Sequence, residues 1–358
     1  MFGFSVFLNE EVKQDYLLSM YQAGFKGIFT SIHIPEDDAS AYVERLKEVG
    51  DFAREHEMEF VVDISEEALA NIGLSFNKLE NLHEMYGLTG IRADYGISNQ
   101  IISLMSQQVD VMLNASTISP QDLVELQEHG ANFSRIEAWH NYYPRPETGL
   151  DVRLFRRVNE WLTQQGMKVM AFVPGDEQLR GPLYLGLPTL EEHRDQAAFT
   201  AALDLQHHYG IDKIFIGDPA IRESSRQQFA SYIQMDTLIF RGTTFLSEAE
   251  RVRLHLTNDH TWTGRMDVAR DILRDTNSRL LNGELSIVPV KEILSRPRGS
   301  VTIDNDLYQR YKGSIHISRC DLAADEKVNV VGQIVEEDLG LLDLIQPRQH
   351  YRIEWQNN

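Results

Sequence analysis

The chain has 358 residues, and 42% of them are hydrophobic, which is sufficient for folded domains with a substantial core. It carries 34 Lys and Arg residues against 54 Asp and Glu residues, a formal net charge of −20. Such an acidic chain repels nucleic-acid phosphates and anionic membranes, so both are excluded as expected partners. A small anionic ligand held in a local basic pocket is not excluded.

A single cysteine, Cys320, makes an internal disulfide bond impossible and fits a reducing compartment. The N-terminal sequence MFGFSVFLNEE has no basic region and turns acidic within a few residues, unlike a signal peptide. The sequence also contains no apolar run approaching the roughly 20 residues that cross a bilayer. We therefore expect a cytoplasmic protein.

The first two thirds of the chain alternate between strand-like and helix-like segments. Short β-branched or aromatic runs, each ended by polar or turn residues, predict eight strands at 2–9, 27–34, 59–65, 90–96, 110–117, 133–140, 168–175 and 212–219. The segments between them carry apolar residues at three- and four-residue steps. Several of these segments end on glycine, as helices do.

Eight strand–helix units in about 235 residues predict a (β/α)8 TIM barrel, whose usual length is about 250 residues. A doubly wound open sheet is the alternative. The count of eight, and the absence of a Gly-rich dinucleotide fingerprint after the first strand, favour the barrel.

The pattern changes near Met235, and residues 236–358 contain strand-like runs with few long helices between them. These runs include TLIFRG, RVRLHL, LSIVPVKEIL, GSVTID, GSIHISR, VNVVGQIV and YRIEWQ. We therefore expect a barrel domain over 1–235 and a small, mainly β domain, itself a barrel, over 236–358.

Nearly every predicted barrel strand ends in a polar residue. Because active sites of TIM barrels lie at the carboxyl ends of the strands, these residues are candidates for a binding or catalytic site. The candidates are Asn9, His33, Asp63, Arg92, Asp94, Asn114, Glu137, His140, Asn141 and Asp218.

Two carboxyl groups form the hypothesis for catalysis. Asp94 is two residues from Arg92 and shares its face, so it is expected to stay ionised and act as nucleophile or base. Glu137 shares a face with Trp139 and is the predicted proton donor. One ionised and one protonated carboxyl group are the apparatus of glycoside hydrolysis. Asp63 and Asp218 are reserve candidates, and structural ion pairs are the alternative interpretation.

The stretch SRIEAWHNYYPRPETGL, residues 134–150, places aromatic side chains on a loop stiffened by Pro144 and Pro146. Trp139, Tyr142 and Tyr143 are predicted to offer flat faces to a sugar ring. The alternative is that the two tyrosines cover a gap between the domains.

Arginines in the predicted loops are candidates for holding an anion. Arg145 is suited to bidentate contact with a carboxylate or phosphate. Arg180 and Arg222 follow the seventh and eighth strands, where this fold often binds phosphate. No HExxH, Cys/His spacing, P-loop or nucleophile elbow occurs, so neither metal nor cofactor is expected.

The motifs HNYYPRPETGL, GLPTLEEHR and NDHTWTG, with RPRGSVTIDN in the second domain, resemble a bacterial family associated with 6-phospho-N-acetylmuramidase activity. The resemblance covers essentially the whole chain and implies a TIM barrel followed by a cyclophilin-like β domain. It also implies cleavage, in peptidoglycan recycling, of the β-1,4 bond between N-acetylmuramic acid 6-phosphate and N-acetylglucosamine. The β domain is then expected to roof the site or bind substrate, with Arg296 and Arg298 reaching in.

Two other functions remain open. A sugar-phosphate lyase or aldolase would use the same barrel, although no lysine for a Schiff base occurs at a predicted strand end. A non-catalytic phospho-sugar binding protein would bind without forming product. The stereochemical course, the division of roles between the carboxyl groups and the oligomeric state, including a homo-oligomer, are left open.

Overall fold

The computed structural model describes residues 1–32, 39–64, 75–76, 79, 81–93 and 96–356. The chain forms two compact units, Met1–Arg226 and Gln227–Asn358. This division falls inside helix α9 (Glu223–Met235). The predicted boundary between residues 235 and 236 stays a prediction.

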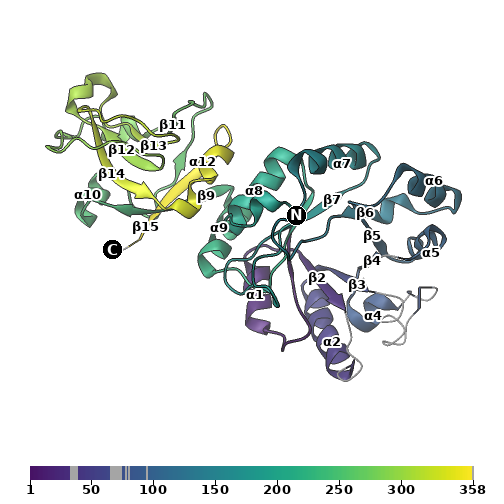
Figure 1. The fold of residues 1–358 in the computed structure, drawn as a ribbon. Helices are drawn as coiled ribbons and strands as arrows, with labels where there is room; N and C mark the ends of the chain where they lie inside the picture. The colour runs from purple at the N-terminus through teal and green to yellow at the C-terminus, as the bar shows by residue number, and fades with distance from the viewer. Residues whose placement is uncertain (33–38, 65–74, 77–78, 80, 94–95, 357–358) are drawn as a thin grey trace. The chain divides into compact units, whose positions relative to one another are not determined.

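The first unit is a closed barrel of eight parallel strands, each hydrogen-bonded to the next, with β8 closing onto β1 (Figure 1). This topology confirms the predicted TIM barrel. The strands are β1 (Phe2–Ser5), β2 (Gly27–Ile32), β3 (Glu59–Ile64), β4 (Gly90–Ala93), β5 (Asp110–Asn114), β6 (Ile136–Trp139), β7 (Val169–Val173) and β8 (Lys213–Ile216).

Helices connect successive strands and lie outside the barrel. They are α1 (Gln14–Gln22), α2 (Ala39–Glu55), α4 (Leu82–Tyr86), α5 (Asn99–Met105), α6 (Pro120–Glu128), α7 (Val152–Gln164) and α8 (Ala198–Tyr209), with α9 after β8 and short 3-10 turns η2 (Phe133–Arg135) and η3 (Glu191–His193). Local sequence sets their starts: Ser119 and Asp122 form a capping box around Pro120, the first residue of α6, and Asp151 caps α7.

Large apolar side chains fill the middle of the barrel, so it is a packed core and not a pore. The cluster comprises Phe29, Val61, Met112, Trp139, Met170, Phe172 and Phe215, all buried. Gly3 makes room for this packing, because a Cβ there would stand 2.4 Å from the Phe215 ring. A ligand must therefore bind at an end of the barrel.

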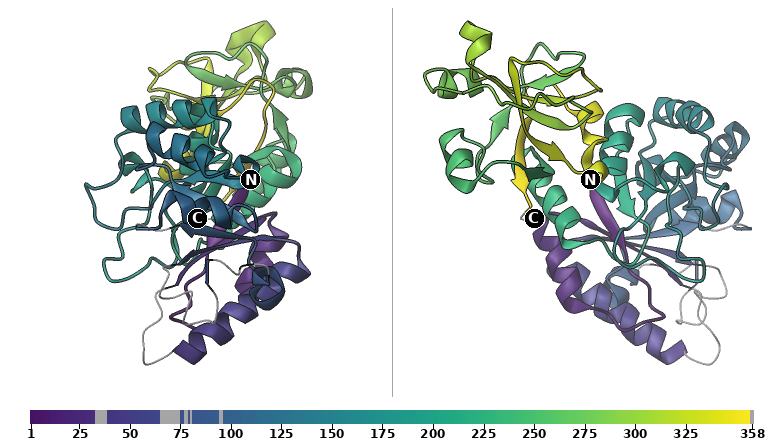
Figure 2. Two further views of the ribbon diagram at one scale, coloured as in Figure 1. Left: turned by 90° about the vertical axis from the view of Figure 1, so that its right-hand side faces the viewer. Right: turned by 60° about the vertical axis from the view of Figure 1, so that its left-hand side comes forward.

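The second unit is one curled, mixed sheet of seven strands in the order β10-β15-β9-β14-β12-β13-β11, green to yellow in Figure 2. The strands are β9 (Thr237–Thr244), β10 (Trp262–Thr263), β11 (Ile272–Arg274), β12 (Ser300–Asp304), β13 (Ile315–Ser318), β14 (Val328–Ile334) and β15 (His350–Trp355). The pair β15–β9 is parallel and the other pairs are antiparallel. The short helical elements are α10 (Glu248–Arg253), α11 (Ser278–Asn282), α12 (Leu341–Leu344), η4 (Asp306–Tyr311) and η5 (Glu336–Asp338).

Two segments of this unit differ from their predicted state. RVRLHL was predicted as a strand but lies partly in α10, where a capping box between Ser247 and Glu250 starts a helix. LSIVPVKEIL, also predicted as a strand, forms none, and its Val288 is 71% exposed. The segment between them contributes the short strand β11.

Candidate active site

The carboxyl ends of β3 and β4 bring an acidic and a basic side chain together inside the barrel. Asp63 and Arg92 are paired across the two strands, and Arg92 Nη1 lies 3.2 Å from Asp63 Oδ2. Arg92 Nη2 also donates to the side-chain oxygen of Asn141, just beyond β6. The side chains of Arg92 and Asp63 are 6% and 20% exposed. A charged pair that is nearly buried at the functional end of a barrel is a candidate site.

A cavity of about 460 Å³ opens at the same end of the barrel. Its lining includes Ser5 and Ser31 at the ends of β1 and β2, the predicted site residue Asn9, and residues 178–182 of the loop after β7. Ser31 pairs with Asp63 across β2 and β3, so the Asp63–Arg92 pair is next to a residue of the cavity wall, although neither member of the pair lines the cavity. Several elements therefore contribute to one site.

Arg180, a predicted anion ligand, lines this cavity and is held by aromatic groups. Its guanidinium carbon lies 4.4 Å from the centre of the Phe7 ring and 5.8 Å from that of Tyr142. Arg180 Nη1 donates to the Tyr142 hydroxyl. Burial raises the pKa of Tyr142, while Arg180 acts to lower it and Asp63 to raise it. Tyr142 thus lies within electrostatic range of both the arginine and the carboxylate.

Asp218, a reserve catalytic candidate, is a structural residue. It is 1% exposed, and its carboxylate accepts backbone N–H groups of Gly175, Arg180 and Leu187 at 2.9, 3.0 and 2.9 Å. Burial raises its pKa, and the three N–H groups oppose that effect. Asp218 fixes the loop that carries Arg180, and it does not face the cavity as a reacting group.

Glu137 is not at the carboxyl end of its strand, so its expected position is wrong. Strand β6 begins at Ile136, and Glu137 is its second residue. Its carboxylate lies 2.6 Å from the ammonium group of Lys213, the first residue of β8, which also contacts Glu59, the first residue of β3, at 2.6 Å. These three side chains form an ion cluster at the amino ends of the strands, opposite Asp63.

Trp139 and His140 lie at the carboxyl end of β6, but both are buried, so neither side chain is exposed to a substrate. Trp139 is fully buried in the barrel core, and its indole N–H donates to Glu137 at 3.0 Å, so it offers no face to a sugar. His140 is also fully buried between Asn159 at 2.7 Å and Ser116 at 3.2 Å. Burial lowers the pKa of His140 to about 4, so it stays neutral and holds the β6 end in place.

The remaining candidates are spread more widely. His33 and Asp94 lie outside the described residues. Asn114 ends β5, and its side-chain oxygen accepts the Ser116 N–H. Arg145 and Arg222 are exposed and do not line the cavity.

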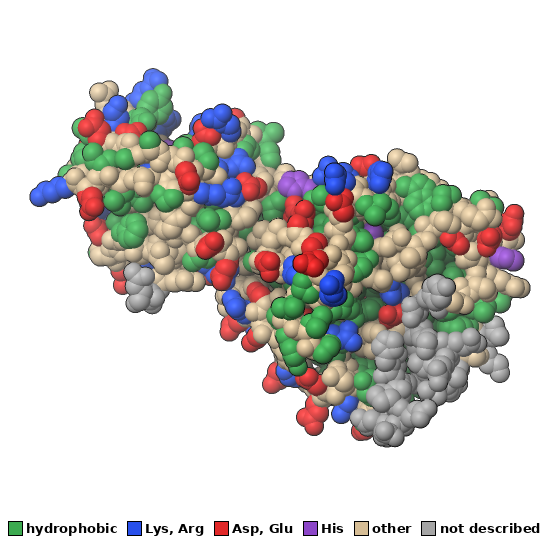
Figure 3. All heavy atoms as spheres, viewed as in Figure 1, with side chains coloured by type: hydrophobic (Ala, Val, Ile, Leu, Met, Phe, Trp, Pro, Cys, Tyr) green, Lys and Arg blue, Asp and Glu red, His purple; other side chains and the backbone are tan. Residues whose placement is uncertain are grey.

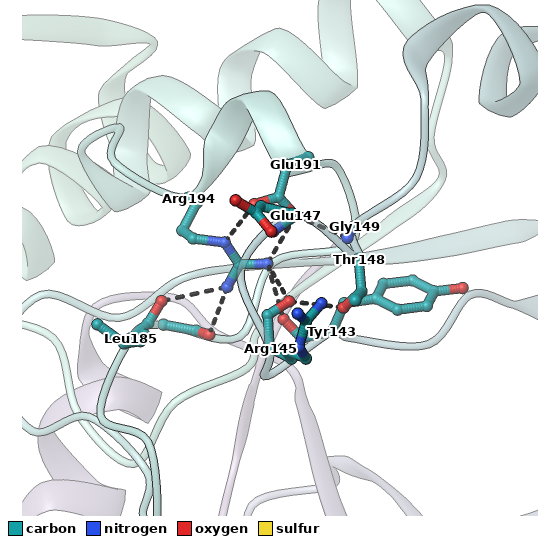
Figure 4. A network of polar contacts seen from close by, with 9 residues as sticks. Tyr143, Arg145, Glu147, Thr148, Gly149, Leu185, Glu191 and Arg194 are labelled. Carbon is teal, nitrogen blue, oxygen red and sulfur yellow. Dashed lines mark hydrogen bonds and ion pairs between the residues drawn. The ribbon is translucent and has the colours of Figure 1, made fainter.

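The stiff loop of residues 140–150 is fastened to the β7 loop by two side chains that sequence reasoning did not single out (Figure 4). Glu191 accepts the backbone N–H groups of Glu147 and Gly149 at 2.8 and 2.6 Å. Arg194 binds Glu191 at 2.6 Å and donates to the carbonyl groups of Tyr143, Arg145, Leu185 and Gly186. We call this pair the Glu191–Arg194 clamp. It fixes the loop that supplies Asn141 and Tyr142.

Among the described residues, one group has the composition of a metal site: Glu192, His193 and Asp204, whose ligand atoms lie within 4.8 Å of one another. His193 Nε2 already bonds Asp204 at 2.8 Å, and its buried Nδ1 has no partner. A metal on Nε2 would leave Nδ1 as a buried N–H without an acceptor, which is unfavourable. This group is therefore explained as a structural His–Asp pair.

The chain is a (β/α)8-barrel protein, and its candidate site, the Asp63–Arg92 pair and the cavity near it, lies at the end of the barrel where this fold usually has its active site. The chain belongs to the 6-phospho-N-acetylmuramidase family: the model of the family's N-terminal domain matches residues 2–231, and that of the C-terminal domain matches residues 243–354. The family name indicates glycosidase activity, and the protein is accordingly an enzyme that acts on a phospho-muramic sugar. The resemblance inferred from the sequence motifs is thereby confirmed.

Two solved structures are similar over the full length. A conserved Enterococcus faecalis protein of unknown function is 42% identical, with a TM-score of 0.89 over 100% of this chain and 97% of that one. An uncharacterized B. cereus protein is 26% identical, with a TM-score of 0.74 over 99% of both chains. No curated protein matches the chain. No described helix is long and apolar enough to span a membrane.

Proposed function

We propose that this enzyme hydrolyses the β-1,4 bond between N-acetylmuramic acid 6-phosphate and N-acetylglucosamine, in the cytoplasm, during peptidoglycan recycling. The family membership supports the reaction class. The site supports a small, anionic substrate, because the cavity combines arginine, hydroxyl and aromatic groups in a protein of net charge −20. Acidic and basic side chains are interspersed over the face drawn in Figure 3, so attraction of an anion must come from the site itself.

The observation that carries the proposal is the position of Asp63. Its carboxylate pairs with buried Arg92 at 3.2 Å and stands beside Ser31, which lines the cavity. A fixed carboxylate next to a glycosidic bond acts as nucleophile, as base, or as the group that orients a 2-acetamido substituent. We assign one catalytic role to Asp63 and the other to Asp94, which follows Arg92 by two residues in the sequence and lies outside the described residues.

Asp63 takes the place of Glu137 in the proposed catalytic pair because of where Glu137 lies. Its carboxylate is neutralised by Lys213 at the other end of the strands, beneath the filled barrel core. A general acid must lie within hydrogen-bond reach of the leaving oxygen, directly or through one water. The buried aromatic layer containing Trp139 and Phe215 separates Glu137 from the cavity end.

The test is incubation with the phosphorylated disaccharide, followed by mass spectrometry. Hydrolysis gives free N-acetylglucosamine and products that together gain one water. Asp63→Asn and Asp94→Asn are each expected to lower kcat by at least about 100-fold, the usual contribution of a positioned carboxyl group. Glu137→Gln serves as the matched carboxyl-to-amide control and is expected to retain kcat.

The competing functions give different outcomes in the same assay. A lyase yields products without the added water, and a binding protein leaves the disaccharide unchanged. Normal turnover by Asp63→Asn, or a collapse of kcat in Glu137→Gln alone, would reject the proposed carboxyl pair while leaving the hydrolytic reaction intact.

A further inference from the structure

Arg180 is held at the cavity by groups that form no ion pair with its guanidinium, although the buried Asp218 carboxylate lies within electrostatic range of it. Its backbone N–H is fixed by Asp218 at 3.0 Å, and its guanidinium lies over Phe7 at 4.4 Å. Tyr142 supplies a neutral hydroxyl as acceptor. Among the residues that the structure describes, no carboxylate forms an ion pair with the Arg180 side chain.

Burying part of a guanidinium group costs free energy unless an anion pairs with it. A partly buried guanidinium has five N–H donors, and the described chain provides one side-chain acceptor, the Tyr142 hydroxyl. Arg92, also at this end of the barrel, already pairs with Asp63 and Asn141. Arg180 is therefore the cavity arginine with capacity for an added anion.

A second cation lines the same cavity. The Lys13 ammonium group donates to the side-chain oxygen of Gln178 at 2.8 Å, which is again a neutral partner. Glu10 and Glu11 also line the cavity, and both are exposed. Gln178 Nε2 contacts Glu10 at 3.3 Å, so the amide lies between this carboxylate and Lys13.

We propose that Arg180, with Lys13, forms the phosphate subsite of the cavity and selects the 6-phosphorylated substrate. The planar, fixed guanidinium suits two phosphate oxygens, and Lys13 adds a point charge. The proposal rests on the proposed function, which supplies the phosphorylated substrate. The lactyl carboxylate is the other anion of that substrate and is the competing occupant.

The experiment compares kcat/KM for three disaccharides: the complete substrate, the substrate without phosphate, and the phosphorylated substrate without the lactyl group. Arg180→Gln is expected to lower kcat/KM roughly 10- to 100-fold for both phosphorylated compounds, the effect of losing a charge-assisted contact. The loss in kcat/KM for the unphosphorylated compound should be much smaller. Arg180→Lys keeps the charge and is expected to recover part of the loss.

The control is Arg153→Gln, which removes an arginine whose side chain is 89% exposed at the start of α7. Arg153→Gln changes the net charge by the same amount as Arg180→Gln, and it should not alter the ratio of kcat/KM values between the substrates. Thermal unfolding of each variant verifies that the barrel remains folded.

Two results for Arg180→Gln would contradict the proposed phosphate subsite. One is an equal loss of kcat/KM on phosphorylated and unphosphorylated compounds, and the other is a loss of kcat/KM that depends on the lactyl group. If wild-type protein cleaves none of the three, the proposed function fails, and the subsite is judged by titration with inorganic phosphate. Phosphate binding that is weakened in Arg180→Gln then supports the subsite by itself, and binding that is absent or unchanged rejects it.

Discussion

Removal of Arg194 tests how strongly the Glu191–Arg194 clamp stabilises the barrel loops. The Arg194 side chain is 7% exposed, and it joins Glu191 to backbone carbonyl groups of two separate loops. Arg194→Ala leaves the Glu191 carboxylate without its cation and four carbonyl groups without their donor. Breaking a buried pair costs about 3–5 kcal/mol, and because Glu191 is 33% exposed we expect the lower end, about 3 kcal/mol.

The assay is urea unfolding monitored by tryptophan fluorescence, with calorimetry as a second measurement. For a unit of this size about 3 kcal/mol corresponds to a fall in Tm of roughly 6–12 °C. Arg194→Lys is the matched variant: it keeps the charge but lacks the planar fork that reaches several carbonyl groups, so most of the loss should remain.

A double-mutant cycle with Glu191→Gln isolates the pair. We expect the two substitutions together to cost less than the sum of the single effects, because each removes the same interaction. Free energies of unfolding within about 0.5 kcal/mol of wild type for Arg194→Ala would show that the clamp contributes little, since surface substitutions have effects of that size.

The clamp also predicts that stability depends on pH. Arg194 and two backbone N–H groups lower the pKa of Glu191 from 4.5 to about 2. The contribution of Glu191 to the free energy of unfolding is therefore present above pH 4.5 and is lost as pH falls toward 2. Thermal melts of Glu191→Gln should therefore vary less with pH over that window than wild type, and identical profiles would contradict the assignment. Asp218→Ala, which strands three buried N–H groups, is expected to cost about 4 kcal/mol in urea unfolding and to raise KM for the phosphorylated disaccharide, whereas an unchanged stability would disprove its structural role. Lys213→Met removes the ammonium group shared by the largely buried carboxylates of Glu59 and Glu137, and it should destabilise by about 3 kcal/mol in the same measurement, the lower end of the usual range because Glu137 keeps Lys168 at 3.7 Å; a neutral effect would show that the cluster is solvated.

The sequence by itself determined the barrel and the family. Eight β-branched runs separated by helical segments predict parallel strands, because strand and helix periodicities are local properties of the chain. The motifs HNYYPRPETGL and GLPTLEEHR identify two loops at the functional end, and the structure shows that they are bound to each other through Glu191 and Arg194.

The end of the barrel on which each polar residue lies was decided by the tertiary structure. Strand β6 was predicted over 133–140 but covers Ile136–Trp139, so Glu137 is the second residue of the strand and not the fifth. The strand begins three residues later than predicted, about 10 Å at about 3.3 Å per residue, and Glu137 therefore lies among the first residues of the strands, beside Lys213.

The local sequence pattern also does not predict which side chains of distant segments pair with each other. Asp63 and Arg92 meet because β3 and β4 are adjacent in register, and Arg180 reaches Tyr142 because the β6 and β7 loops lie together. Residue type marks a side chain as able to form an ion pair, but the choice of partner depends on barrel closure and strand register. Those long-range contacts, and the burial that accompanies them, separate the residues that hold the barrel together from those that can meet a substrate.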